Sequence, residues 1–295
     1  MSTFLLKLIA MLTMLIDHSA VALYYSGVLS SEPLYFVMRS VGRIAFPVFC
    51  FTLTVGYEKT SDREKYLSRL CAFAVISQLP FSLVALEENY SPAAVSGLSL
   101  CPQALLLILP LAVYYVYGCG RKLRPSLLWA AAAMLLGSAD LSAGGYVLLS
   151  HTDLNVFYTL AVSLVCMRAY DLLTGNGDST EKAMCALAAI ITVSVLQINA
   201  DYALEGLLLA LLLHIYRDSG KKQVTVCVLW CAFMYFLPVL VGETKYIIMG
   251  GISMLAPLMI GLYNGRRGPK MRTAFYLVYP VHLGLLAALS RIFVG

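Results

Sequence analysis

The stretch LKLIAMLTMLIDHSAVAL, residues 6–23, decides the fold class of this chain. It is apolar over almost its whole length, and about 20 such residues are enough for a helix to span a bilayer. Yet Asp17 and His18 stand side by side near its middle. Ionisable side chains at membrane depth are costly and usually functional. The same stretch therefore predicts both a membrane span and a site.

Comparable apolar stretches recur to the end of the chain. The 295 residues are 60% hydrophobic and only 13% charged, whereas a soluble domain carries about 25% charged residues. Mean hydropathy is +0.80. We therefore expect an all-α polytopic membrane protein, with residues 1–295 forming a single transmembrane domain. The net charge of +5 does not indicate nucleic-acid binding, because the basic residues lie in short clusters between apolar runs.

The loops between the apolar runs predict the topology. Basic residues cluster after the second, fourth, eighth and tenth runs, with a weaker signal after the sixth, and basic loops face the cytoplasm. We therefore expect a cytoplasmic amino terminus in a multi-pass protein of the cytoplasmic membrane, which in bacteria is the inner membrane. About eleven helices are predicted, over residues 4–25, 35–57, 67–86, 103–118, 126–149, 154–172, 183–200, 203–216, 223–241, 246–263 and 273–293.

Four ionisable residues are predicted to lie near one depth in the membrane. A rise of about 1.5 Å per residue places His18 about 16 Å from the cytoplasmic end of its helix. The same rise places Arg43 about 12 Å in from outside and His282 about 14 Å in from inside. Asp17 adjoins His18, so three helices bring these four groups toward the bilayer midplane. We expect them to share an interior site.

Helical spacing then separates their partners. Neighbouring helix residues point about 100° apart, so Asp17 should face Arg43, or Arg39 one turn further out, rather than orient His18. Lys7 and His18 are eleven residues apart, almost three full turns, and line one stripe of the first helix. A ligand with an anionic head and a long thin arm fits that stripe. Coenzyme A has this form: its phosphates would meet Lys7 while its thioester reached His18.

Each of these residues also has a purely structural interpretation. Asp17 and Arg43 can form a structural ion pair. His18 can be a hydrogen-bonded interior histidine, and His282, beside a proline, can be structural as well. Lys7 alone would be an ordinary snorkelling lysine. The basic cluster GRRGPKMR, residues 265–272, can simply keep its loop in the cytoplasm. Composition and spacing leave these alternatives open.

Several stretches in order along the chain resemble the TraX family. They are LKLIAMLTMLIDH (6–18), RSVGRIAFPVFCFTLTVGYEKT (39–60), SQLPF (77–81), NVFYTL (155–160), ADYALEGLLL (200–209) and YLVYPVHLGLL (276–286). Each is weak alone, but together they cover the chain and are fairly specific. The family is named after an enzyme that acetylates the amino terminus of conjugative pilin. The resemblance says less about the substrate of this chain.

The TraX family is similar in turn to a wider group of transmembrane acyltransferases. These include the lysosomal heparan-α-glucosaminide N-acetyltransferase and bacterial polysaccharide O-acetylases, which pass an acyl group from cytosolic acyl-CoA to an acceptor on the far side. Many carry a basic or amide residue, ten intervening residues and a histidine on an early helix, and Lys7 and His18 match that spacing. The arginine-pair motif of the polysaccharide enzymes is not matched, because Arg39 and Arg43 have a different spacing.

The resemblance implies acyl transfer from acetyl-CoA within the membrane, with no metal ion. We expect His18 to act as general base, or as a nucleophile that forms an acetyl-imidazole. Arg43, His282 or Tyr279 would donate a hydrogen bond to the thioester oxygen. The phosphates of coenzyme A would meet Lys7 together with Arg266, Arg267 and Lys270. An external amine or hydroxyl of a peptide, glycan or small molecule would approach along the polar residues Asn155, Asp201 and Glu205.

Two other function classes stay open. Midplane ionisable groups are also typical of proton-coupled transporters and flippases, and so are helices broken by proline or glycine. We expect such breaks at FPVF (46–49), QLPF (78–81), APLMIG (256–261) and VYPV (278–281). Against that class, the chain shows no internal repeat. A structural membrane subunit, surrounded by lipid and without catalytic activity, is the third option. The sequence leaves the acceptor, the acyl chain length and the oligomeric state undetermined.

Overall fold

The computed structural model describes residues 1–89, 97–99, 140–143, 146–149, 154–175 and 200–294. The chain divides into two compact units, and neither is continuous in sequence. Unit 1 comprises Met1–Gly56, Leu83–Asn89 and Leu212–Gly295. Unit 2 comprises Tyr57–Ser82 and Tyr90–Leu211.

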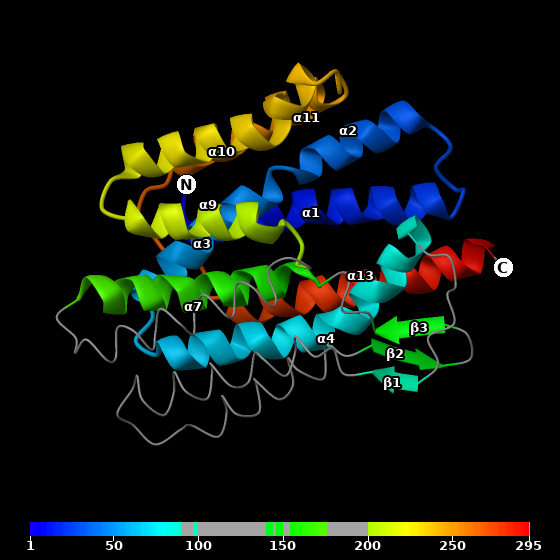
Figure 1. Cartoon of the computed structure of the whole chain (residues 1–295), viewed down its shortest axis with the longest axis horizontal. Coiled ribbons are helices and arrows are strands. Elements are labelled where there is room, and N and C mark those ends of the chain that lie inside the picture. Colours follow the sequence, from blue (N-terminus) through cyan, green and yellow to red (C-terminus); the bar gives the residue numbers. More distant parts are fainter. Residues whose placement is uncertain (90–96, 100–139, 144–145, 150–153, 176–199, 295) are drawn as a thin grey trace. The chain divides into compact units, whose positions relative to one another are not determined.

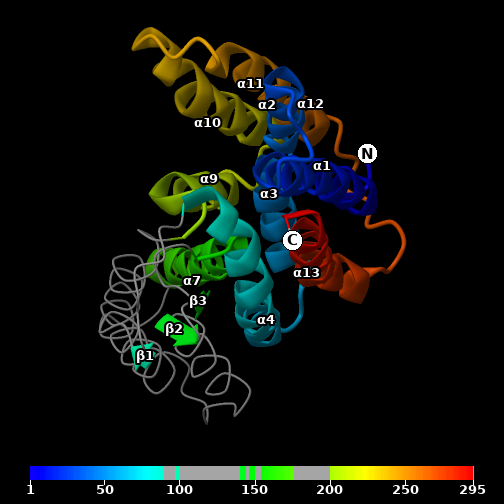
Figure 2. The same cartoon turned by 90° about the vertical axis from the view of Figure 1, so that its right-hand side faces the viewer.

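Helices of unit 1 begin at serines that cap their first turns. The hydroxyl of Ser2 accepts from the Leu5 amide, and Ser31 accepts from the Leu34 amide, which satisfies amides that a helix start leaves unpaired. Helix α1 contacts α2 and α13, and α10 contacts α11 and α12 (Figures 1 and 2). The helices of this unit are α1 (Thr3–Tyr25), α2 (Glu32–Gly42), α3 (Ala45–Lys59), α10 (Gly220–Leu240), α11 (Tyr246–Ser253), α12 (Leu255–Gly261) and α13 (Arg272–Val294). Helix α3 belongs to unit 1 as far as Gly56.

Two predicted helices are each interrupted in unit 1. The helix predicted over 35–57 is broken between α2 and α3 at Arg43, and the one predicted over 246–263 is broken between α11 and α12. In an α-helix each amide donates to the carbonyl four residues earlier. For Pro47 and Pro257 these carbonyls belong to Arg43 and Ser253. Proline has no amide hydrogen to complete that bond. The breaks therefore follow from the prolines.

Unit 2 holds the amino-terminal part of α4 (Arg63–Asn89), α7 (Val156–Thr174) and most of α9 (Ala203–Ile215). Helix α7 is buried along most of its length, as its apolar residues on every face require. Three short antiparallel strands form a sheet in the order β1-β2-β3. They are β1 (Gly97–Ser99), β2 (Asp140–Ala143) and β3 (Tyr146–Leu149).

The predicted helical architecture is confirmed for most of the described chain, and one predicted helix is wrong over its described residues. The helix expected over 126–149 is replaced over 140–143 and 146–149 by strands β2 and β3, which pair with each other. In the sequence DLSAGGYVLL a Gly-Gly pair separates these two runs, and such a pair is typical of a hairpin turn. The helix expected over 103–118 lies outside the described residues, and so do residues 183–199 of the helix expected over 183–200.

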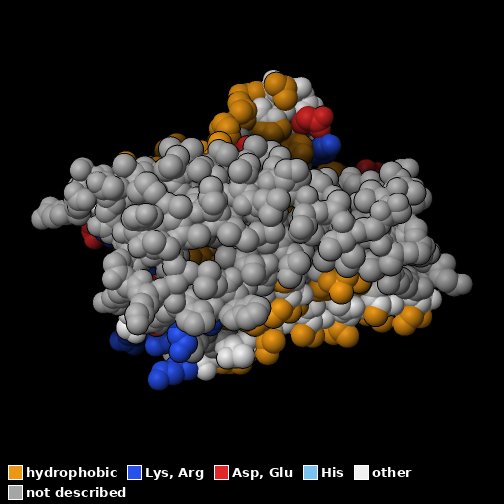
Figure 3. All heavy atoms as spheres, turned by 60° about the horizontal axis from the view of Figure 1, so that its bottom comes forward, with side chains coloured by type: hydrophobic (Ala, Val, Ile, Leu, Met, Phe, Trp, Pro, Cys, Tyr) orange, Lys and Arg blue, Asp and Glu red, His pale blue; other side chains and the backbone are white. Residues whose placement is uncertain are grey.

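The surface of the described residues fits a bilayer. Six of their helical stretches are long and apolar enough to cross a membrane. Large hydrophobic side chains are exposed along them, among them Leu229, which is 64% exposed, and Leu285, which is 59% exposed. Figure 3 shows hydrophobic side chains over the described part of one face. The chain is therefore a multi-pass membrane protein, while the number of eleven spans and the cytoplasmic amino terminus stay predictions.

Candidate functional site

The rings of His18 and His282 meet within unit 1. His18 lies in the carboxy-terminal half of α1 and His282 in the middle of α13, 264 residues apart in sequence. Nδ1 of His18 is 2.7 Å from Nε2 of His282, and the rings are almost parallel at 7°. Nδ1 of His282 is 2.7 Å from the carbonyl oxygen of Val278. His282 is buried, whereas His18 keeps part of its surface exposed.

Beside this pair, Asp17 binds two arginines from α2 and its end. Arg39 donates from Nη1 to Oδ1 of Asp17 at 2.7 Å, and Arg43 donates from Nη2 to Oδ2 at 2.9 Å. Nε of Arg43 also donates to the backbone carbonyl of Arg39 at 3.1 Å, which holds the Arg43 guanidinium against α2. The sequence left Arg39 and Arg43 as alternative partners of Asp17. Both bind it, and the predicted ion pair is confirmed.

Gly42 makes this close approach possible. A Cβ on Gly42 would lie 2.3 Å from Cβ of Asp17 and 2.4 Å from its Cγ, so the Asp17 side chain rests against the glycine backbone. Residues with a side chain at position 42 would push α1 and α2 apart. The pairing of Asp17 with Arg39 and Arg43 thus depends on a glycine at the end of α2.

Two tyrosines enclose the ionised cluster and the histidine pair. Tyr279 packs edge-on against both imidazoles, with ring centroids 5.9 Å from His18 and 5.6 Å from His282. Tyr235 of α10 is buried, and its hydroxyl lies near Arg43 and Asp17. Tyr279 thus shares the face of His282, as the spacing predicts, and both tyrosines limit how far these rings and guanidiniums can turn.

The amino-terminal end of α1 is docked on the loop that precedes α13. The amides of Thr3 and Phe4 donate to the carbonyls of Arg266 and Arg267, at 2.9 and 3.1 Å. The amino group of Met1 donates to the carbonyl of Leu262, and the Thr3 hydroxyl lies 3.1 Å from that of Tyr263. These contacts satisfy amides that the helix itself leaves unpaired. They also hold the basic loop beside the first turns of α1.

Lys7 shares this end of α1 with the basic loop. Its charge lies close enough to Arg267 for the two to repel each other. Between Lys7 and His18 the same stripe of α1 carries Met11 and Met14, spaced four, three and four residues apart. Arg266, Arg267 and Lys270 are exposed. The predicted basic end and the histidine end of the stripe are therefore both present within unit 1, about 16 Å apart along α1.

In unit 2, Asn155 has a structural role. It is fully buried at the start of α7, where its side-chain oxygen accepts from the Phe157 amide. Its side-chain nitrogen donates to the carbonyl of Ala74 at 2.7 Å and to Oε1 of Gln78 at 2.8 Å. Both side-chain atoms are thus engaged within the protein. The prediction that Asn155 receives an acceptor finds no support in this geometry, because the amide is needed to cap α7.

The other two predicted acceptor residues lie near the start of α9. Leu154 and Ala200 form a parallel bridge, and the Asp201 amide donates to the Leu154 carbonyl at 2.8 Å. Asp201 therefore precedes the helix, while Glu205 lies in its first turn, and both are partly exposed. The structure thus brings Asp201 beside the Asn155 segment within unit 2. Their binding of an acceptor stays a prediction.

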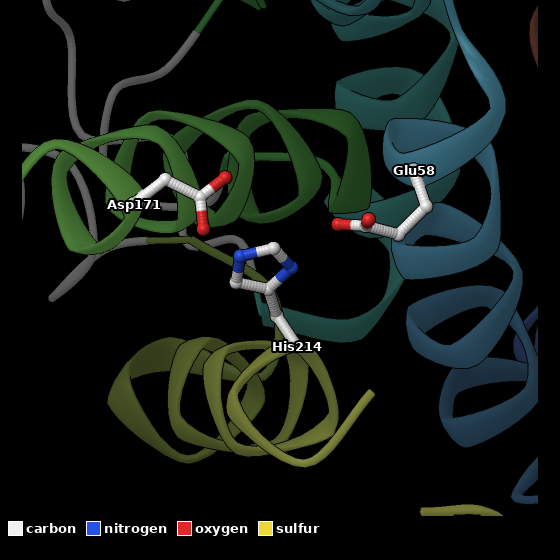
Figure 4. A group of neighbouring side chains, drawn as sticks. All are labelled: Glu58, Asp171 and His214. Atoms are coloured by element: carbon white, nitrogen blue, oxygen red, sulfur yellow. The ribbon is translucent and has the colours of Figure 1, made fainter. Parts of the chain in front are cut away.

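A second polar cluster of unit 2 was not singled out from the sequence. The hydroxyl of buried Tyr57 donates to Oδ2 of Asp171 at 2.9 Å, and Arg63 lies 3.7 Å from the same oxygen. The guanidinium of Arg63 also stacks 4.4 Å from the centre of the Tyr57 ring. Figure 4 shows the carboxylates of Asp171 on α7 and of Glu58 near the end of α3. This cluster ties the start of α4 to α7.

Sequence reasoning missed two contributors to the site of unit 1. Tyr235 reaches Arg43 from α10, and no spacing in the sequence relates residues 192 positions apart. Gly42 is different, because a glycine directly before an ionisable residue in an apolar stretch is a visible signal of close backbone approach. That signal, read together with Asp17, points to the contact.

The comparisons with known proteins agree with the resemblance noted in the sequence. A family model described as TraX protein matches residues 2–144 and 120–290. A probable fimbrial assembly protein FimC, serogroup H1, from Dichelobacter nodosus is 28% identical over 295 residues, covering 97% of this chain and 95% of that protein. No solved structure matches the chain. Because the family model covers nearly all of its residues, this chain belongs to the TraX family.

Proposed function

We propose that this chain is a membrane acyltransferase that moves an acetyl group from cytosolic acetyl-CoA to an amine or hydroxyl on the opposite side. Membership of the TraX family supports a membrane acetyltransferase in general. The arrangement of α1 carries the finer proposal. One stripe of this helix bears His18, hydrogen-bonded to His282, and eleven residues earlier Lys7, beside the docked loop of Arg266 and Arg267.

The basic end suits the donor. Coenzyme A carries several phosphate charges, and Lys7 with Arg266, Arg267 and Lys270 offers a set of cations for them. The arm of coenzyme A is long, thin and weakly polar. Met11 and Met14 line the way to His18, and methionine adapts its shape to such a group. The proposal therefore places the phosphates at the start of α1 and the thioester near His18.

The histidine end suits the transfer. As the acceptor nitrogen or oxygen bonds to the thioester carbonyl carbon, its proton passes to His18. The carbon–sulfur bond then breaks, and the proton passes from His18 to the sulfur of coenzyme A. Negative charge develops meanwhile on the carbonyl oxygen, where Arg43 or Tyr279 would donate a hydrogen bond. An acetyl-imidazole formed by His18 itself is the variant with the same groups.

The acceptor is proposed from the relative. That protein is called a probable fimbrial assembly protein, so the amine of a fimbrial subunit is the first acceptor to test. Asp201 and Glu205 would attract an ammonium group at the opposite side of the membrane. Other peptides, a cell-envelope glycan or a small metabolite remain further acceptors to compare. We place the enzyme in the cytoplasmic membrane, with its amino terminus inside.

The test uses the purified protein in lipid nanodiscs with acetyl-CoA. We expect coenzyme A to raise the thermal midpoint and the thioester to be hydrolysed slowly. His18→Ala should stop hydrolysis yet keep the stabilisation, whereas Lys7→Ala should weaken both. Lys245→Ala is the matched control, because Lys245 is exposed and pairs with Glu243 at 3.0 Å, away from the site. Absence of both responses in the unmodified protein would contradict the proposal.

One observation favours a second function, that of a transporter or flippase. Two apolar helical stretches of unit 1 are broken part-way along, at Arg43 and at Met254. Discontinuous helices of this kind form substrate and ion sites in secondary transporters. A carrier would move a substrate across the membrane of proteoliposomes without consuming acetyl-CoA. Uptake that persists in His18→Ala, with no thioester hydrolysis in the unmodified protein, would favour this class.

A further inference from the structure

The contacts of the two histidines form a directed chain of hydrogen bonds. It begins at the carbonyl oxygen of Val278, which lies 2.7 Å from Nδ1 of His282. A carbonyl oxygen only accepts, so Nδ1 of His282 must carry the hydrogen. A neutral imidazole carries one ring hydrogen, which leaves a lone pair on Nε2 of His282. That nitrogen therefore accepts from Nδ1 of His18, at 2.7 Å.

The hydrogen bond between His18 and His282 decides which ring nitrogen of His18 carries the hydrogen. With its one hydrogen on Nδ1, His18 has a lone pair on Nε2, the nitrogen that points away from His282. The opposite tautomer would bring two lone pairs within 2.7 Å of each other. A protonated His282 would instead reverse the bond and leave the hydrogen of His18 on Nε2. That form needs an extra positive charge on buried His282, and a charge in an apolar interior is costly.

We propose that His282 is a positioning residue that holds His18 in the Nδ1–H tautomer and so directs its reactive lone pair onto Nε2. This inference rests on the proposed function of His18 in acyl transfer. The acceptor proton then passes to Nε2 of His18, and from there to the sulfur of coenzyme A as the carbon–sulfur bond breaks. While His18 is charged, its Nδ1–H bond to His282 is strengthened, because hydrogen bonds from charged donors are the stronger ones.

The chain also narrows the roles of the neighbouring groups. Both ring nitrogens of His282 are engaged, with Val278 and with His18, so His282 does not serve as a donor to the thioester oxygen. Arg43 and Tyr279 remain for that role. Tyr279 packs edge-on against both imidazoles at 69°, which holds the rings in the orientation that the chain of hydrogen bonds needs.

Two substitutions separate positioning from packing. His282→Gln places a side-chain oxygen that can accept near the position of Nε2, whereas His282→Leu fills similar space and cannot accept. Thioester hydrolysis should fall at least about 10-fold in His282→Leu and largely recover in His282→Gln. Stabilisation by coenzyme A should be unchanged in both variants. A purely structural His282 would show equal losses in the two variants, together with a lower thermal midpoint.

The tautomer itself is measured without any enzymatic assay. Nitrogen NMR of 15N-histidine-labelled protein in nanodiscs distinguishes protonated from bare ring nitrogens, and a His18→Ala sample assigns the signals. We expect Nδ1 of His18 to be protonated and Nε2 bare in the unmodified protein and in His282→Gln. A hydrogen on Nε2 of His18 overturns the inference even if thioester hydrolysis is found. If the expected tautomer is found but the protein does not hydrolyse the thioester, only the proposed function is contradicted.

Discussion

The contact between Gly42 and Asp17 makes a sharp prediction for Gly42→Ala. The added methyl carbon would lie 2.3 Å from Cβ of Asp17, 2.4 Å from Cγ and 2.8 Å from Oδ1. The nearest of these atoms is bonded to the backbone of α1, so it cannot turn away as the tip of a flexible side chain would. The substitution must therefore separate α1 from α2 or displace the Asp17 side chain from Arg39 and Arg43.

The expected cost follows from these two effects. Overpacking a well-packed interior costs about 1–3 kcal/mol. Alanine is favoured over glycine inside a helix by up to about 1 kcal/mol, although Gly42 is the last residue of α2 and gains less. Loosening the bonds of Asp17, which is 7% exposed, adds to the loss. We expect Gly42→Ala to lower the free energy of unfolding by roughly 1–3 kcal/mol.

The assay is unfolding by denaturant in mixed micelles, with helicity as the readout. Gly284→Ala is the matched control, because Gly284 lies within α13 and a Cβ there meets nothing within 4 Å. It should leave stability unchanged or raise it slightly. In an Asp17→Gly background, which removes the opposing Cβ, Gly42→Ala should cost nothing further. Equal stability of Gly42→Ala and Gly284→Ala, or an undiminished cost beside Asp17→Gly, would refute the reasoning.

Substitutions at three further sites, Gly268, Asn155 and Tyr57, test other contacts by their effect on unfolding. Gly268→Ala and Gly265→Ala share a left-handed backbone, with φ of +74° and +75°, but only at Gly268 would the methyl meet Phe4, at 2.7 Å. Gly268→Ala should therefore lower the free energy of unfolding by about 1–3 kcal/mol more than Gly265→Ala does. Equal losses in the two variants would contradict the docking of α1. Asn155→Leu should cost roughly 2–4 kcal/mol, because the α7 cap and the bonds to Ala74 and Gln78 are lost together. Asn155→Asp keeps the cap acceptor, so its stability should lie between those of the unmodified protein and Asn155→Leu. Unchanged stability in Asn155→Leu would show that the network is dispensable. Tyr57→Phe should cost about 1 kcal/mol through its bond to Asp171, and an unchanged thermal midpoint would exclude that contribution.

The sequence by itself determined the class of protein and much of its helical framework. Long apolar runs have only one way to satisfy their backbone groups in lipid, apart from a closed barrel, and that is the helix. The bounds expected for α1, α7, α9, α10 and α13 therefore agree with the structure to within a few residues. The motifs FPVF and APLMIG predicted the breaks at Arg43 and Met254, whereas Pro80 of QLPF and Pro280 of VYPV lie inside continuous helices, so the breaks predicted there are wrong. The strands at 140–149 were readable from the Gly-Gly pair, but the long apolar run around it favoured a helix.

Helical periodicity likewise predicted which residues of α1 share a face. Lys7 and His18 share a face because eleven residues make almost three full turns. Asp17 and His18 point apart because neighbouring residues are rotated by about 100°. Such arguments hold within one helix because its geometry is regular. They also predicted that Asp17 would meet an arginine, since an unpaired carboxylate at membrane depth is too costly.

Only the tertiary structure decided which groups meet across helices. It joined His18 to His282 over 264 residues, gave Asp17 both arginines and brought Tyr235 to Arg43. It also engaged Asn155 as a helix cap, where its polarity alone had suggested an acceptor site. Depth in the membrane can be counted along a helix, but the rotation of one helix against another depends on how all their side chains pack. That rotation brought the two imidazoles within hydrogen-bonding distance, and no spacing in the sequence contains it.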